Sequence, residues 1–153
     1  MQKHDFYQSL VKQTESLIAG ESNVIANLAN ISALLFTSLE DVNWAGFYFM
    51  DSPTELVLGP FQGNPACIRI PVGKGVCGTA AATAETQLIE DVHAFDGHIA
   101  CDAASNSEIV IPIHKNGEVF AVLDIDSPSI ARFDVDDKQG LEALVACFEA
   151  TIA

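Results

Sequence analysis

The chain has 153 residues, of which 49% are apolar, enough for one domain with a full hydrophobic core. It carries 7 basic and 21 acidic residues, a net charge of −14, which argues against binding to nucleic acid or to anionic membranes. No apolar run approaches the roughly 18 residues of a membrane span, and the N-terminus MQKHDFYQSL lacks the pattern of a signal peptide. Four cysteines in a chain of this size do not indicate a secreted disulfide scaffold, so we expect a soluble cytoplasmic protein with reduced thiols.

The first part of the chain predicts two helices. Apolar residues recur at helical spacing over residues 2–19 and again over residues 22–39. Gly20 is a residue that ends helices, and Ser22 is a suitable N-cap for the second helix. We therefore expect both helices to precede the sheet.

The middle of the chain changes to the period of strands. Residues 43–50 (NWAGFYFM) and 55–62 (ELVLGPFQ) predict a hairpin across the turn DSPT. A short strand is expected at residues 68–71, a small Ala-rich helix at 76–84 and another short strand at 87–90.

The last part of the chain predicts a long loop, a hairpin and a helix. Residues 91–107 are irregular, and loops of this length inside a domain are usually functional or disordered. Residues 108–114 and 118–126 are expected to form a hairpin over Lys115, Asn116 and Gly117, where Asn-Gly is a tight-turn signal, and residues 135–152 an amphipathic helix. The inner side of this helix is expected to carry Leu141, Leu144, Val145, Phe148 and Ile152. Helices, hairpins and a closing helix together predict an α+β domain, an antiparallel sheet packed against helices over residues 1–153.

The four cysteines occupy different surroundings. Cys147 lies among apolar residues of the last helix, and we interpret it as an inert buried thiol. Cys77 falls in the first turn of the small helix, where the helix N-terminus favours a thiolate, although packing against the sheet explains it equally well. Cys67 is expected at a reachable junction between loop and strand. Cys101 lies among small and polar residues of the long loop, an exposed place for a residue type that is usually buried.

Two kinds of site fit the exposed cysteines. His93, His98 and Cys101, completed by Cys67 or Cys77, could form a zinc site, but their spacing is not a familiar zinc spacing. The alternative is a reactive thiol with a resolving thiol that folding brings near, which explains two cysteines at exposed positions. The chain contains no Cys-x-x-Cys, so a thioredoxin-like redox pair is not encoded.

Acids form a second candidate site. Asp124 and Asp126 in VLDID point to one face of their strand, and Glu108 begins the partner strand. A two-residue turn at Asn116-Gly117 sets Glu108 opposite Ile125, on the other face, whereas a three-residue turn sets it opposite Asp124. The sequence leaves both registers open. Clustered acids suit an ammonium site or a carboxylic acid that gives up a proton, and solvated strand ends are the alternative.

An aromatic pair forms the third candidate site. Trp44 and Tyr48 share one face of their strand, with Gly46 between them as an open floor. Phe47 and Phe49 on the other face are expected in the core. A slot for a flat or thinly apolar ligand and plain core packing explain the pair equally well.

These motifs together resemble one family. The run IPVGKGVCGTAAATAETQLIEDVHAFDGHIACDAASNSEIVIPI, with NWAGFYF before it and VLDIDS after it, closely resembles the free methionine-(R)-sulfoxide reductases, which are stand-alone GAF-domain enzymes. The resemblance is close over residues 40–130, and the flanking helices fit the GAF layout. It therefore implies a single GAF domain.

The resemblance also implies a set of site residues. Cys101 corresponds to the catalytic cysteine and Cys67 to the resolving cysteine, while a third family cysteine at Cys77 has a less certain role. The family's substrate pocket corresponds to two aromatic residues and three acids, namely Trp44, Tyr48, Glu108, Asp124 and Asp126. All these positions carry the residues that the family has.

A reaction follows from the resemblance. The Cys101 thiolate attacks the sulfoxide sulfur, and a protonated carboxyl of the Glu108 and Asp126 group helps the oxygen to leave as water. Methionine departs, Cys101 becomes a sulfenic acid, and Cys67 forms a disulfide with it that thioredoxin reduces. An acid such as Asp124 takes the ammonium of the substrate, which explains a preference for the free amino acid. The reaction needs no metal and no organic cofactor.

Two other functions fit the sequence less well. A GAF sensor that binds a small ligand without chemistry is the main alternative, but the chain shows no output domain and an acidic pocket suits anionic nucleotides badly. A structural zinc module is the second. Because GAF domains often pair through their outer helices, the resemblance implies a homodimer.

Overall fold

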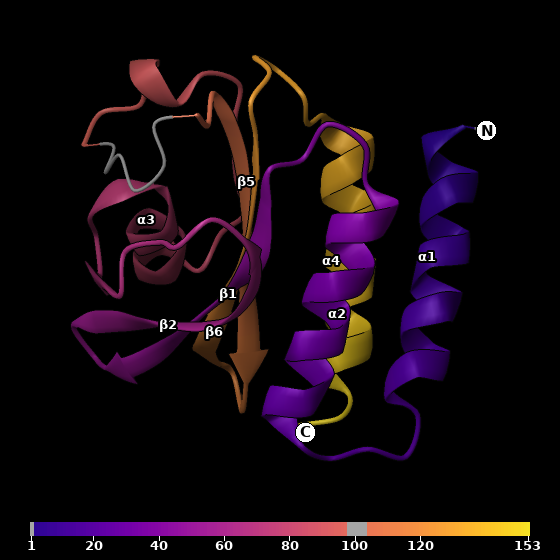
Figure 1. Ribbon diagram of the computed structural model, residues 1–153. Coiled ribbons are helices and arrows are strands. Elements are labelled where there is room, and N and C mark those ends of the chain that lie inside the picture. The colour runs from indigo at the N-terminus through magenta and orange to yellow at the C-terminus, as the bar shows by residue number, and fades with distance from the viewer. Residues whose placement is uncertain (1, 98–103) are drawn as a thin grey trace.

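The computed structural model describes residues 2–97 and 104–153 of the chain. In chain order the elements are α1 (Lys3–Ile18), α2 (Val24–Ser38), β1 (Trp44–Ser52), β2 (Glu55–Gly63), β3 (Arg69–Pro71), α3 (Gly75–Thr83), β4 (Gln87–Ile89), the 3-10 helix η1 (Val92–Ala94), β5 (Ser107–Lys115), β6 (Glu118–Ser127) and α4 (Val135–Glu149). The strands form one six-stranded sheet in the order β3-β2-β1-β6-β5-β4, with antiparallel neighbours. Helices α1, α2 and α4 cover one face of the sheet, and α3 lies on the other face (Figure 1). The predicted α+β architecture is confirmed.

The helices begin and end near their predicted limits. Helix α2 is capped by Asn23 rather than Ser22, because the Asn23 side chain accepts a hydrogen bond of 2.9 Å from the backbone of the first turn. Helix α1 ends at Ile18, and Gly20, with φ of 75°, follows in the turn. Helix α4 stops at Glu149, short of its predicted end, although its predicted inner face is buried. No helix in the described ranges has the length and apolar character that a membrane span needs.

The strands are also close to the prediction. The turn between β1 and β2 is tighter than expected, because Ser52 continues β1 and pairs with Glu55. Pro53 and Thr54 alone make the turn. The short elements β3, α3 and β4 lie within one residue of their predicted limits, and the predicted irregular stretch contains η1.

The hairpin of β5 and β6 combines a tight turn with a bulge. The turn has two residues, Asn116-Gly117, with φ of 54° and 79°, as a tight hairpin requires. His114 pairs with Val119, but the next pair along the ladder is Ile113 with Ala121. One strand therefore contributes an extra residue, which is a β-bulge.

The bulge decides on which face Glu108 lies. Glu108 pairs with Asp126, and neither of the two partners expected from the turn, Ile125 and Asp124, is correct. The turn alone would have directed Glu108 to the helical face, since a shift of one residue reverses every side chain of a strand. The bulge restores Glu108 to the face that also carries Asp124 and Asp126.

Two apolar cores lie on the two faces of the sheet. The larger core lies under α1, α2 and α4 and includes Phe47, Leu123 and Phe148, each nearly inaccessible to solvent. The predicted core position of Phe47 is confirmed, and Phe49 packs against the same core. The smaller core lies under α3 and includes Trp44. The larger core holds the fold together, and the smaller one surrounds the candidate site.

A buried acid that the sequence did not single out joins α1 to α4. Asp137 is 1% exposed and accepts hydrogen bonds from the Tyr7 hydroxyl at 2.6 Å and from the Lys3 ammonium at 2.7 Å. It also forms a capping box with Asp134 at the start of α4, and the Arg132 guanidinium lies 3.6 Å away.

Candidate active site

The three predicted acids lie together on the α3 side of the sheet. Asp126 on β6 pairs with Glu108 on β5 and with Trp44 on β1, which sets these residues in one cross-strand row. Asp124 lies two residues before Asp126 and therefore on the same face. Glu108 is 7% exposed and Asp124 is 6% exposed, so the alternative of solvated strand ends is wrong for both.

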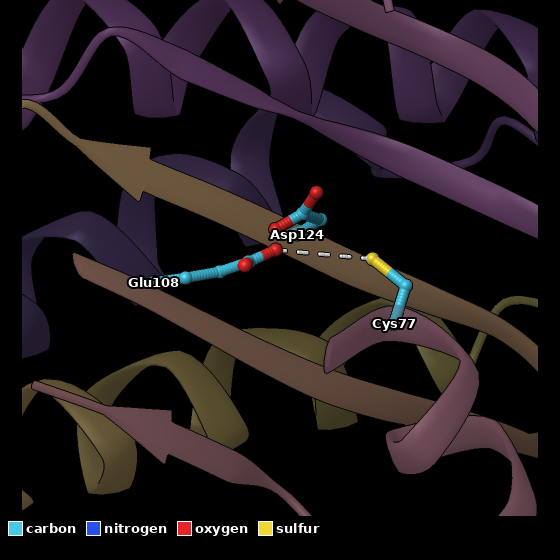
Figure 2. Close-up of side chains that lie close together, drawn as sticks. All are labelled: Cys77, Glu108 and Asp124. Carbon is cyan, nitrogen blue, oxygen red and sulfur yellow. Dashed lines mark hydrogen bonds between the residues drawn. The ribbon is translucent and has the colours of Figure 1, made fainter. Parts of the chain in front are cut away.

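Helix α3 brings a thiol to this cluster of acids. Cys77 lies in the first turn of α3 and is 5% exposed. Its Sγ is 4.0 Å from Oε2 of Glu108, to which it can donate a weak hydrogen bond. Figure 2 shows Cys77, Glu108 and Asp124 pointing toward one another from one helix and two strands. We call Cys77, Glu108, Asp124 and Asp126 the acid cluster.

Burial favours the protonated forms of Glu108 and Cys77. Burial raises the pKa of Glu108 well above its ordinary value, and the charges of Asp124 and Asp126 raise it further. Burial likewise raises the pKa of the Cys77 thiol, with the same acids adding to the effect. Of the two alternatives that the sequence leaves open for Cys77, the burial of its side chain favours packing against the sheet. The acid cluster can hold a proton on Glu108 and present it as a hydrogen-bond donor.

The acid cluster has the spacing of metal ligands. One donor atom each from Cys77, Glu108 and Asp124 lies within 4.8 Å of the others. Burial favours the neutral thiol and the neutral acid, so a metal ion would have to displace these protons on binding. The same arrangement can therefore hold either a metal ion or a proton. The zinc combination considered from the sequence depends on His98 and Cys101, which lie outside the described residues.

The aromatic pair lies beside the acids, but the space at Gly46 between the two rings is filled. Trp44 and Tyr48 share the predicted face, are both buried, and stack with ring centroids 6.0 Å apart. The expected opening at Gly46 is wrong, because a Cβ there would lie 2.2 Å from Cβ of Phe61. The Phe61 ring also stacks on Trp44 at 5.1 Å. The sequence missed Phe61, since an irregular pairing between β1 and β2 decides which residue reaches across Gly46.

The polar ends of the aromatic pair hold the segment that carries Cys67. The Trp44 indole N–H donates to the carbonyl of Asn64 at 3.1 Å, and the Tyr48 hydroxyl donates to the carbonyl of Cys67 at 2.9 Å. Cys67 is partly exposed just before β3, as predicted, and it is disulfide-bonded. The aromatic pair therefore contacts both the acids and the backbone of a predicted redox residue.

Of the remaining cysteine and histidine candidates, Cys147 and His93 lie within the described residues. Cys101, the predicted nucleophile, lies outside the described residues. Cys147 is free and half-buried rather than buried, with Sγ 3.7 Å from Oε1 of Glu15. Partial burial and the Glu15 charge raise the pKa of Cys147, which agrees with an inert thiol. His93 lies 2.9 Å from the side-chain oxygen of Asn106.

Comparison with known proteins identifies the family. A family model described as the GAF domain matches residues 13–152. The free methionine-R-sulfoxide reductase of Escherichia coli (strain K12) is 58% identical over 153 residues, which is 100% of this chain and 92% of that protein. This chain belongs to the free methionine-R-sulfoxide reductase family of GAF domains.

Other members of the family agree. The free methionine-R-sulfoxide reductase of Saccharomyces cerevisiae (strain ATCC 204508 / S288c) is 46% identical over 151 residues, covering 94% of this chain and 84% of that protein. The X-ray structure of the free methionine-R-sulfoxide reductase from Neisseria meningitidis in complex with its substrate matches with a TM-score of 0.95 and 43% identity. That match covers 99% of this chain and 91% of the other. The reductase is thus an oxidoreductase with the expected GAF fold.

Proposed function

We propose that this reductase converts free L-methionine-(R)-sulfoxide to L-methionine, with Cys101 as nucleophile and Glu108 as acid. The observation that carries the proposal is the buried Glu108 carboxyl, whose raised pKa keeps a proton available beside Asp124 and Asp126. Membership of the free methionine-R-sulfoxide reductase family supports the choice of substrate.

The first step reduces the substrate and oxidises the enzyme by two electrons. Glu108 donates its proton to the sulfoxide oxygen while the Cys101 thiolate attacks the sulfur, and the oxygen leaves as water after taking a second proton from solvent. A water molecule then attacks Sγ of Cys101, the bond between the two sulfurs breaks, and methionine departs with the electron pair. Cys101 is left as a sulfenic acid, and one proton returns to Glu108.

Recognition of the free amino acid follows from the acids. Asp124 or Asp126 accepts hydrogen bonds from the substrate ammonium, which a peptide-bound residue lacks. Trp44 and Tyr48 hold the methyl end against their rings. This division of labour explains why three acids share one face when a single acid would suffice for proton transfer.

Recycling uses a second cysteine and a protein dithiol. The Cys67 thiol attacks the sulfenic acid of Cys101, a disulfide forms and water leaves. Thioredoxin then reduces this disulfide and is itself oxidised. The half-exposed place of Cys67 before β3, and its ability to form a disulfide, support this role.

Cysteine variants test the proposal in single turnover, with reduced enzyme and free (R)-sulfoxide but no thioredoxin. The parent chain releases methionine once per chain, and so does Cys147→Ser, a matched control on the far face of the sheet. Cys101→Ser releases none. Cys67→Ser releases methionine once but is recycled poorly when thioredoxin is added. Full cycling by Cys101→Ser would overturn the proposal.

The cellular setting is part of the same proposal. A cytoplasmic location matches the need for reduced thiols and thioredoxin.

We also propose a homodimer that is paired through the outer helices. Light scattering would measure its mass. A monomeric mass would contradict the dimer without affecting the chemistry.

A further inference from the structure

Cys77 is a buried thiol for which the proposed reaction has no step. It is free, 5% exposed, and its Sγ lies 4.0 Å from Oε2 of Glu108. The sequence leaves two roles open, a reactive thiol, which could resolve the sulfenic acid in place of Cys67, and a residue that packs against the sheet. The geometry favours a third role.

We propose that Cys77 is a positioning residue that shields the Glu108 carboxyl from water and so keeps on it the proton that the reaction uses. In this role Cys77 forms no disulfide during the catalytic cycle. The inference rests on the proposed role of Glu108 as the acid, and it adds a second residue through which that acid is controlled.

The surroundings of Glu108 explain why its neighbour matters. Among residues 2–97 and 104–153, the titratable groups that face its carboxyl are Asp124 and Asp126 from β6, Tyr48 from β1 and Cys77 from α3, while β4 offers none. Each of these groups is either neutral or negative. A thiol is a weak hydrogen-bond donor, so it stabilises an ionised carboxylate less than a hydroxyl or a water molecule would. Cys77 therefore favours the protonated form of Glu108.

The start of α3 is packed too closely for Cys77 to act as a mobile resolving thiol. A Cβ at Gly78 would lie 2.5 Å from the carbonyl oxygen of Pro71. The Gly73 N–H donates to the Gly78 carbonyl at 2.8 Å, and the Lys74 N–H donates to the Pro71 carbonyl at 3.1 Å. A resolving thiol must also ionise readily, and burial raises the pKa of Cys77.

Infrared titration of the reduced protein without substrate tests the inference directly. The carbonyl band of a protonated carboxyl is assigned to Glu108 by its loss in Glu108→Gln. In Cys77→Ser the hydroxyl is a stronger hydrogen-bond donor to the Glu108 carboxylate. The titration midpoint of this band should therefore fall by about one pH unit, which is a tenfold lower proton affinity. Cys77→Ala, which adds no polar group, should shift the midpoint by less and in the same direction, and it serves if Cys77→Ser fails to fold.

The pH profile of single-turnover methionine release gives a second readout. The alkaline limb should move to lower pH in Cys77→Ser by the same amount, while thioredoxin still recycles the variant. Unmoved infrared midpoints in both variants would overturn the inference, and loss of recycling with an unmoved profile would assign Cys77 to the thiol–disulfide cycle instead. Because the infrared midpoint is read without substrate, it does not depend on whether the proposed reaction occurs.

Discussion

Glu108 is the residue on which the proposed chemistry depends. A carboxyl buried beside two other acids is costly to ionise, and burial raises the pKa of Glu108 accordingly. The same cost that destabilises the ionised form keeps the proton on Glu108 at pH values where an exposed glutamate is ionised.

Replacing Glu108 by Gln keeps the shape and removes the proton. We expect Glu108→Gln to slow single-turnover methionine release by about 10²-fold, the usual contribution of a general acid. The variant should also lose the alkaline limb of the pH profile, which the parent shows because activity falls as Glu108 ionises. Glu118→Gln, an exposed acid of the same hairpin, is the matched control and should behave like the parent. Equal rates in both variants would exclude Glu108 as the acid.

The same residue predicts how stability depends on pH. The folded pKa of Glu108 is raised, so folding takes up a proton between the unfolded value near 4.5 and the folded value. Stability present below the unfolded value is therefore lost as pH rises toward the folded value. Glu108→Gln removes this loss. The free energy of unfolding of the variant, measured in urea, should therefore increase relative to that of the parent as pH rises. A constant difference across pH would contradict the assignment.

At Gly46, strand β1 approaches strand β2 closely. A Cβ there would lie 2.2 Å from Cβ and 2.7 Å from Cα of Phe61, and backbone atoms cannot give way cheaply. We expect Gly46→Ala to lower the free energy of unfolding by about 1–3 kcal/mol, as overpacking does. Urea unfolding measures this loss, and a variant as stable as the parent would show that β2 can move away from β1.

At the scale of elements, the packing of α1 on α4 depends on a buried carboxylate. Asp137 accepts hydrogen bonds from Lys3, from the Tyr7 hydroxyl and, in the capping box, from the Asp134 N–H, so its removal leaves the buried Tyr7 hydroxyl without this acceptor. We expect Asp137→Ala to lower the free energy of unfolding by about 1–3 kcal/mol, the cost of a buried polar group left unsatisfied.

Asp136 provides the control for this prediction. It is the exposed neighbour of Asp137 in the first turn of α4, and Asp136→Ala should change the free energy of unfolding only slightly. Methionine release per folded chain should be unchanged in both variants, because the acid cluster lies on the opposite face of the sheet. Equal stability of the two variants would show that the contacts of Asp137 contribute little.

The elements also show what the sequence could and could not predict. The sequence patterns located the four α-helices and six strands of the described residues within a few residues, but they did not predict the short 3-10 helix η1. The position of Glu108 was not predictable, since an Asn-Gly turn and a bulge together set the register. Gly46 was misread for a similar reason: the side chain that covers it comes from another strand. Local patterns thus predicted the elements, and contacts between strands decided the site.

At the scale of the whole molecule, the sheet separates stability from chemistry. The helices α1, α2 and α4 cover the larger core on one face, and α3 covers the acids and the aromatic pair on the other (Figure 1). The burial of Cys77 beside the acids could not be predicted from the sequence, because its surroundings come from β5 and β6 as well as α3. Substitutions in the larger core should therefore change stability before they change the reaction.

The central claim is the choice of substrate, and one measurement tests it most directly. NADPH consumption in the presence of thioredoxin and thioredoxin reductase should be compared for free L-methionine-(R)-sulfoxide, its (S) epimer and a peptide-bound sulfoxide. We predict turnover with the free (R) form alone, because in the proposed reaction an acid of the cluster binds the substrate ammonium, and because the relatives are named free methionine-R-sulfoxide reductases. No turnover with any of the three by folded, reduced protein would contradict the proposed reaction.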